Sequence, residues 1–158
     1  MNIFAVSSNP NECARALDDQ RLNKMIIETG QLLSTALYYW NEPEYNQVYR
    51  RTHDNHPVNK WVRENVNHFG WTFHLFMELI TERQFRRDTN HKTENLVQPF
   101  LNVVQRHGVM LPDTPEYFQN SSFYKSLPVC EAYRWTLIDK WNSDVRPSWT
   151  RRGPPEWL

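Results

Sequence analysis

Mostly apolar residues recur at helical spacing in the first part of the chain, between Leu17 and Leu33. They stand three or four positions apart and would form one stripe on a helix: Leu22, Met25, Ile26, Thr29, Leu32 and Leu33. We expect this helix to continue to Trp40. A short helix should precede it, because Asn9 is a suitable N-cap and Pro10 suits the first helical position.

A longer periodic segment covers residues 58–87 and predicts the main core helix. Its stripe consists of Val58, Val62, Phe69, Phe73, Phe76 and Ile80. Further helices are expected from Thr93 until Gly108 and from Pro128 onward. Residues 41–55 and 111–128 should be loops, the second rich in aromatic residues, and residues 142–158 an irregular tail. The pattern therefore predicts an all-α fold, a compact single-domain bundle of roughly five helices over residues 1–158.

The composition narrows the possible classes of protein. With 18 basic and 18 acidic residues the formal net charge is zero, so any nucleic-acid surface must arise from segregation of charge. Only four glycines are present and no Gly-rich loop, which argues against a nucleotide cofactor. No apolar run is long enough to span a membrane. Cys13 and Cys130 are far apart, which favours free thiols and a cytoplasmic location.

Glu28 is the first candidate for chemistry. On a helix it shares a flank with Lys24, four positions before it, and with Arg21, seven positions before it. A lone carboxylate between apolar neighbours and cations can serve as a tuned acid or base. The alternative is an ordinary surface pair between Lys24 and Glu28. Spacing alone favours the surface pair.

A resemblance changes that balance. The segment LDDQRLNKMIIE, which ends at Glu28, resembles the LDxQxLxxxxxE stretch of the pyrimidine-dimer DNA glycosylase (endonuclease V-like) family. Two further segments are similar to motifs of that family: Asn55-His56-Pro57, and Arg146-Pro147-Ser148-Trp149 in one branch. The likeness consists of scattered short motifs over most of the chain and is that of a divergent, phage-type member.

The resemblance implies a reaction on DNA without a cofactor. In that family the α-amine of the chain attacks C1′ of a damaged pyrimidine nucleotide, forms an imine and nicks the strand, while a Glu assists proton transfer. An α-amine suits this role because its ordinary pKa near 8 leaves a neutral fraction at pH 7. Here the Glu would be Glu28. Residue 2 is Asn, a poor context for removal of the initiator Met, so the amine is expected to belong to Met1.

Other residues are candidates for holding the DNA or the site. His53, Asp54 and His56 fit no standard zinc spacing, and no metal is predicted. His56 is placed near the site by the resemblance, where it would contact a phosphate or the catalytic Glu. Cationic, polar and aromatic residues along the chain are candidates for contacts with double-stranded DNA: Arg21, Lys24, Arg50, Arg51, Asn55, Lys60, Arg63, Trp149, Arg151 and Arg152. For the tail, packing against the helices is an equal alternative.

Three functions remain open on this basis. The first is a DNA glycosylase/AP lyase with Met1, Glu28 and His56 as its catalytic residues. The second is a transferase that modifies a hypermodified thymine in DNA on the same scaffold. The third is a non-catalytic helical module that binds DNA. In each case we expect a monomer in the cytoplasm, which for a phage protein is that of the host cell.

Overall fold

The computed structural model describes residues 1–109 and 112–158, and all regular structure in these ranges is helical. The α-helices are α1 (Pro10–Ala16), α2 (Asp19–Tyr39), α3 (Pro57–Glu64), α4 (Val66–Arg87), α5 (Val97–Arg106) and α6 (Val129–Ser143). Two short 3-10 helices, η1 (Pro43–Asn46) and η2 (Lys92–Leu96), lie in the connections. The predicted all-α class is confirmed. No helix among the described residues is long and apolar enough to cross a membrane.

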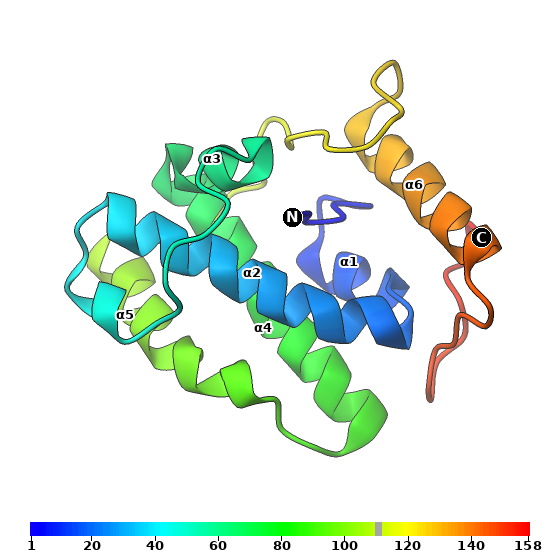
Figure 1. Cartoon of the computed structure of the whole chain (residues 1–158), viewed down its shortest axis with the longest axis horizontal. Coiled ribbons are helices and arrows are strands. Elements are labelled where there is room, and N and C mark those ends of the chain that lie inside the picture. The colour runs from blue at the N-terminus through cyan, green and yellow to red at the C-terminus, as the bar shows by residue number, and fades with distance from the viewer. Residues whose placement is uncertain (110–111) are drawn as a thin grey trace.

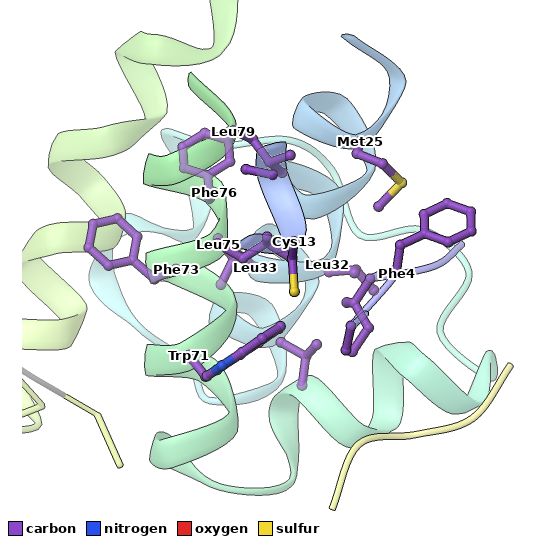
Figure 2. Close-up of a cluster of buried hydrophobic side chains, with 14 of the residues drawn as sticks. Phe4, Cys13, Met25, Leu32, Leu33, Trp71, Phe73, Leu75, Phe76 and Leu79 are labelled. Atoms are coloured by element: carbon purple, nitrogen blue, oxygen red, sulfur yellow. The ribbon is translucent and has the colours of Figure 1, made fainter. Parts of the chain in front are cut away.

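The two longest helices, α2 and α4, pack against each other at the centre of the molecule (Figure 1). Helix α1 packs on α4, and α3 covers one end of both long helices. Their apolar faces meet in one core, in which Trp71 and Phe76 of α4 and Leu32 and Leu33 of α2 take part, while the ring of Phe73 points to the other side of α4 (Figure 2). Helix α6 lies at the opposite side of the molecule from α5 (Figure 1).

The prediction of a single helix over residues 58–87 is wrong, because the helix is interrupted at Asn65. Asn65 has extended backbone angles, φ −157° and ψ 168°, which end α3. Its side chain accepts a hydrogen bond from the His68 N–H over 2.9 Å and so caps α4. Val62 and Phe69, on either side of the break, are both buried. Because they stand seven positions apart, the apolar pattern keeps its phase across the break and conceals it.

Other predicted elements differ less from the structure. The short helix capped by Asn9 is confirmed, and the central helix begins at Asp19, capped by Asp18, and ends at Tyr39. The segment expected as a helix from Thr93 begins with η2 before α5. The predicted loop over residues 111–128 contains no helix in its described part, residues 112–128, while Leu111 lies outside the described residues. Phe118 of this loop is buried, with its ring 4.7 Å from that of Trp71.

The first residues of the chain form an extended segment that enters the core. Ile3, Phe4, Ala5 and Val6 are all buried. The side chain of Asn2 accepts hydrogen bonds from the backbone N–H groups of Ile3 (2.8 Å) and Phe4 (2.9 Å). Phe4 has a φ of +40°, an uncommon value for a residue with a side chain. Burial and these hydrogen bonds fix the direction in which the chain terminus points, toward the middle of the molecule (Figure 1).

Candidate functional site

The α-amine of Met1 lies 4.0 Å from Oε2 of Glu28. On its other side, Glu28 Oε1 lies 3.6 Å from Nζ of Lys24, one turn earlier in α2. The Glu28 side chain is 15% exposed and that of Lys24 is 70% exposed. The Lys24–Glu28 pair expected from the spacing is therefore present, but the carboxylate also faces the amine. This carboxylate has one oxygen for each of two cations.

Met1 and Glu28 line a hollow of about 270 Å³ between the chain terminus, α2 and α6. It is lined by Met1, Asn2, Phe4, Gln20, Arg21, Lys24, Met25, Glu28 and Lys140. Lys140 comes from α6, and nothing in its local sequence marked it as a candidate. It is brought there because the indole N–H of the neighbouring Trp141 donates a hydrogen bond to Oδ1 of Asp18, the N-cap of α2, over 2.8 Å.

Arg21 lines the same hollow, but its charge is already paired. Its Nη1 lies 3.0 Å from Asp18 Oδ1 and 2.7 Å from Asp144 Oδ2. Burial lowers the pKa of Arg21, but the hydrogen bonds to Asp144 and Asp18 outweigh it and raise the pKa above its ordinary value. Among the cations of the hollow, Lys24 and Lys140 are exposed, whereas the Arg21 side chain is only 14% exposed. Arg21 therefore ties the start of α2 to the end of α6.

His56 caps α3 and is not among the residues that line this hollow. Its Nδ1 accepts a hydrogen bond from the backbone N–H of Val58 over 3.2 Å. Burial lowers the pKa of His56, and the positive charge of the chain terminus and His53 lower it further, while the negative charge of Glu28 acts in the opposite direction. The charges of both Met1 and Glu28 act on the ring of His56. A role of His56 in the reaction stays a prediction.

The remaining candidates of this half of the chain lie around α3 and the loop before it. Arg51 pairs with Asp54, and its guanidinium lies 4.5 Å from the ring centre of Tyr38. Arg63 donates to the backbone oxygen of Asp54 over 2.7 Å. Asn55, Lys60 and Arg63 line a second hollow of about 500 Å³ at the start of α3. Arg50, Asn55 and Lys60 are exposed.

The tail residues are held against the helices. The indole N–H of Trp149 donates to the Ala16 backbone oxygen over 3.0 Å. Arg152 pairs with the buried Glu82, and Arg151 pairs with Asp88. The structure thus contains the packed tail that was one of the two alternatives. Contact of Trp149, Arg151 and Arg152 with DNA stays a prediction, and these three residues line none of the hollow around Met1.

The cysteines and the possible metal ligands lie apart in the described residues. Cys13 and Cys130 are free. Burial raises the pKa of the Cys13 thiol to about 12, so that it stays protonated, and its Sγ–H faces the Ser7 backbone oxygen at 3.1 Å. Within residues 1–109 and 112–158, no three His, Cys, Asp or Glu side chains are grouped to hold a metal ion.

Comparison with known proteins identifies one family. Residues 1–95 match the family model described as pyrimidine dimer DNA glycosylase. This range contains Met1, Glu28 and His56, while Lys140 and the tail lie beyond it. Neither the curated proteins nor the solved structures contain a match.

Proposed function

Because the chain belongs to the pyrimidine dimer DNA glycosylase family and is thus a DNA repair enzyme of the glycosylase type, we propose that Met1 and Glu28 form its reaction centre. One observation supports this assignment above all: the Met1 amine faces the Glu28 carboxylate at 4.0 Å. The amine is the nucleophile and Glu28 is the group that accepts and returns its proton. The substrate is double-stranded DNA that carries a damaged pyrimidine, and the protein acts as a monomer.

The proposed chemistry begins at C1′ of the damaged nucleotide. Glu28 takes a proton from the amine, whose lone pair then forms a bond to C1′. The bond between C1′ and the pyrimidine breaks, and its electron pair leaves with the base, which takes up a proton. The bond from C1′ to the ring oxygen O4′ then opens, O4′ receives a proton from Glu28, and the amine nitrogen and C1′ become an imine.

The imine then permits cleavage of the strand. It makes the hydrogens on C2′ acidic, so that loss of one of them expels the 3′ phosphate by β-elimination. Hydrolysis of the imine by water releases the sugar and restores the amine. The nucleotide must leave the base stack before the amine can reach C1′. Lys24 and Lys140, exposed cations that line the hollow, would then hold flanking phosphates.

Borohydride trapping tests this proposal. Duplexes that carry a thymine dimer, an abasic site or 5-hydroxymethyluracil are incubated with the protein and then reduced. We expect a covalent adduct at the N-terminal residue, identified by peptide mass spectrometry, and a strong loss of its formation in Glu28→Gln. The matched control is Glu116→Gln, which changes an exposed carboxylate of the loop.

A second variant tests the amine itself. Extra residues placed ahead of Met1 move the amine away from Glu28 and should abolish the adduct without preventing folding. Absence of an adduct on every substrate, with an intact Met1 terminus and measurable DNA binding, would reject imine chemistry. It would leave base modification and plain DNA binding as the functions to test.

A further inference from the structure

Three tyrosines form an exposed aromatic cluster at the end of α2. Tyr38 and Tyr39 are the last two residues of that helix, and Tyr45 belongs to η1, which packs against it. The three residues are 41%, 42% and 53% exposed. The ring centre of Tyr38 lies 5.6 Å from that of Tyr39 and 6.4 Å from that of Tyr45. Large aromatic side chains that contact one another in solvent, rather than standing singly, indicate a binding surface.

Two arginines lie on these rings. The guanidinium carbon of Arg51 is 4.5 Å from the ring centre of Tyr38, and that of Arg63 is 4.0 Å from the ring centre of Tyr39. A planar guanidinium on an aromatic ring offers a further flat surface on which a nucleic-acid base can stack. We call the five residues Tyr38, Tyr39, Tyr45, Arg51 and Arg63 the tyrosine surface.

The tyrosine surface is ordered by its own hydrogen bonds. Oδ2 of Asp54 accepts a hydrogen bond from the Tyr39 hydroxyl over 2.8 Å and lies 3.0 Å from Nη1 of Arg51. The Asp54 backbone oxygen accepts from Nη2 of Arg63 over 2.7 Å. Arg63 also donates to Oδ1 of the buried Asn59 over 3.0 Å. Because these side chains are already held in place, a partner that binds to them loses less conformational entropy.

The charge around the tyrosine surface is positive although the whole chain is neutral. Residues 45–64 contain four Lys or Arg and two Asp or Glu, a formal excess of two positive charges. Lys60 and Arg63 line the hollow of about 500 Å³ at the start of α3. The negative charge of the neighbouring Glu44 is balanced by Arg106, which lies 2.5 Å away. Segregation of positive charge on one face is complementary to the phosphates of a nucleic-acid strand.

The spacing of the rings favours an unpaired strand over a duplex. Successive base pairs of a duplex stand about 3.4 Å apart, and stacking covers the faces of their bases. The rings of Tyr38, Tyr39 and Tyr45 are farther apart than this and meet edge to face, at 82° and 72°. Each ring therefore presents its face in a different direction, which suits bases that are separated from their neighbours. Aromatic rings interspersed with cations are how proteins bind single strands without regard to sequence.

The tyrosine surface is on the same helix as the reaction centre but apart from it. Tyr39 follows Glu28 by eleven residues, which places it roughly 16 Å further along α2 and within about 20° of the same side of the helix. Among the described residues that line the hollow at Met1, none belongs to the tyrosine surface. A ligand on this surface is therefore bound without contact to the amine.

We propose that the tyrosine surface binds a single-stranded segment of DNA. The bases stack on the tyrosine rings and on the guanidinium groups, and the phosphates pair with the exposed cations around them. The inference goes beyond the proposed function, because it gives the protein a second site for DNA that takes no part in the reaction at Met1. A duplex with a strand that is unpaired beside the damaged nucleotide can occupy both sites.

Binding of a fluorescent oligothymidylate of about 12 nucleotides, followed by anisotropy, tests the inference. The double variant Tyr38→Leu/Tyr45→Leu removes two rings and should lower the affinity about 10–100-fold. Tyr38→Phe/Tyr45→Phe retains both rings and should bind like the wild type. Because both side chains are exposed, the thermal midpoint of either variant should stay near the wild-type value.

Phe85→Leu is the matched control. Phe85 is 46% exposed on α4, and the guanidinium carbon of Arg152 lies 4.7 Å from its ring centre, so it forms the same kind of pair outside the tyrosine surface. This substitution should leave the affinity for the oligothymidylate unchanged.

Arg51→Gln tests the charge separately from the rings. The logarithm of the association constant should fall less steeply with the logarithm of the salt concentration, with a slope smaller by about 0.7, the value for one phosphate contact on a single strand. Tyr38→Leu/Tyr45→Leu should keep the wild-type slope, because it removes no charge. If this variant proves unstable, the slope of Arg51→Gln decides, and an unchanged slope would overturn the inference.

Other results would also overturn the inference. Wild-type protein that binds the duplex but not the oligothymidylate would lack the second site. Equal affinities of the wild type and Tyr38→Leu/Tyr45→Leu would place the strand elsewhere, and an equal loss of duplex binding in that variant would assign the surface to duplex DNA. Borohydride trapping on intact duplexes reports on the proposed function alone, and it should proceed in this variant at the wild-type rate.

Discussion

The hydroxyl of Thr150 donates a hydrogen bond to Oδ2 of Asp19 over 2.6 Å, which joins the C-terminal tail to the first turn of the helix that carries Glu28. The Ser148 hydroxyl and the Thr150 backbone N–H donate to the same carboxylate. The fully buried Arg86 pairs with Asp19 at 3.1 Å and with Glu82 at 2.8 Å. A polar network thus connects α2, α4 and the tail behind the site.

Replacement of Asp19 should destabilise the whole protein. In Asp19→Asn the buried guanidinium of Arg86 loses one of its two carboxylates, and loss of a buried charge partner costs about 3–5 kcal/mol. We expect a fall of that size in the free energy of unfolding measured in urea. Asp113→Asn, which changes an exposed loop carboxylate, should alter it by less than about 0.5 kcal/mol. Equal stability of the two variants would show that Arg86 does not need Asp19.

The same carboxylate predicts a loss of stability in acid. Burial raises the pKa of Asp19, but the hydrogen bonds from Thr150, Arg86 and Ser148 outweigh it and hold the pKa below its ordinary value. The folded state then binds this proton more weakly than the unfolded chain. Its contribution is complete above roughly pH 4 and falls as the pH drops further. Urea unfolding below this pH should show a smaller pH dependence in Asp19→Asn than in the wild type.

His91, which caps η2, predicts a second loss of stability, in a pH range above that of Asp19. Burial lowers the pKa of His91 and Arg83 lowers it further, so the folded protein binds fewer protons there than the unfolded chain. Stability should therefore decrease as the pH falls below about 6.5. His91→Asn keeps a capping acceptor without the titration, and its thermal midpoint should drop less between pH 7.5 and 5. A drop as large as that of the wild type would assign the effect to other groups.

Gly70 is predicted to tolerate no side chain. A Cβ atom at this position of α4 would lie 2.5 Å from Val109 Cγ1 and 3.1 Å from Pro112 Cβ. Gly70→Ala should therefore lower the free energy of unfolding by roughly 1–2 kcal/mol, since overpacking exceeds the gain in helix propensity. Gly153→Ala in the tail, where no atom lies within 4 Å of the added Cβ, is the matched control and should be neutral. If Gly70→Ala stabilised the protein, Val109 and Pro112 would have to move aside without loss of packing energy.

Lys24 should contribute to DNA binding through its charge alone. Its side chain is 70% exposed at the rim of the hollow, so its removal leaves the core intact. Lys24→Gln should weaken binding to all duplexes. The logarithm of the association constant should fall less steeply with the logarithm of the salt concentration, with a slope smaller by about 1. The exposed Lys92→Gln on η2 should leave this slope unchanged. An unchanged slope in Lys24→Gln would place the DNA away from the hollow.

Much of the helical architecture could be predicted from the chain itself, because helix formation is governed by residues close in sequence. The stripe of α2, the cap Asn9 and the pair Lys24–Glu28 all lie within one or two turns. Even here the break at Asn65 was missed, since Asn residues also occur in loops and inside helices. Only the backbone angles distinguish these uses.

The site depended on contacts between residues remote in sequence. Glu28 could be singled out from its neighbours and from the family motif, but its spacing favoured a surface pair. The buried N-terminal segment brings the Met1 amine to its free oxygen, and the Trp141–Asp18 hydrogen bond brings Lys140 to the same hollow. The sequence by itself determined the helices and the chemical types available. The tertiary structure decided which groups meet, because burial and packing place side chains that no local periodicity relates.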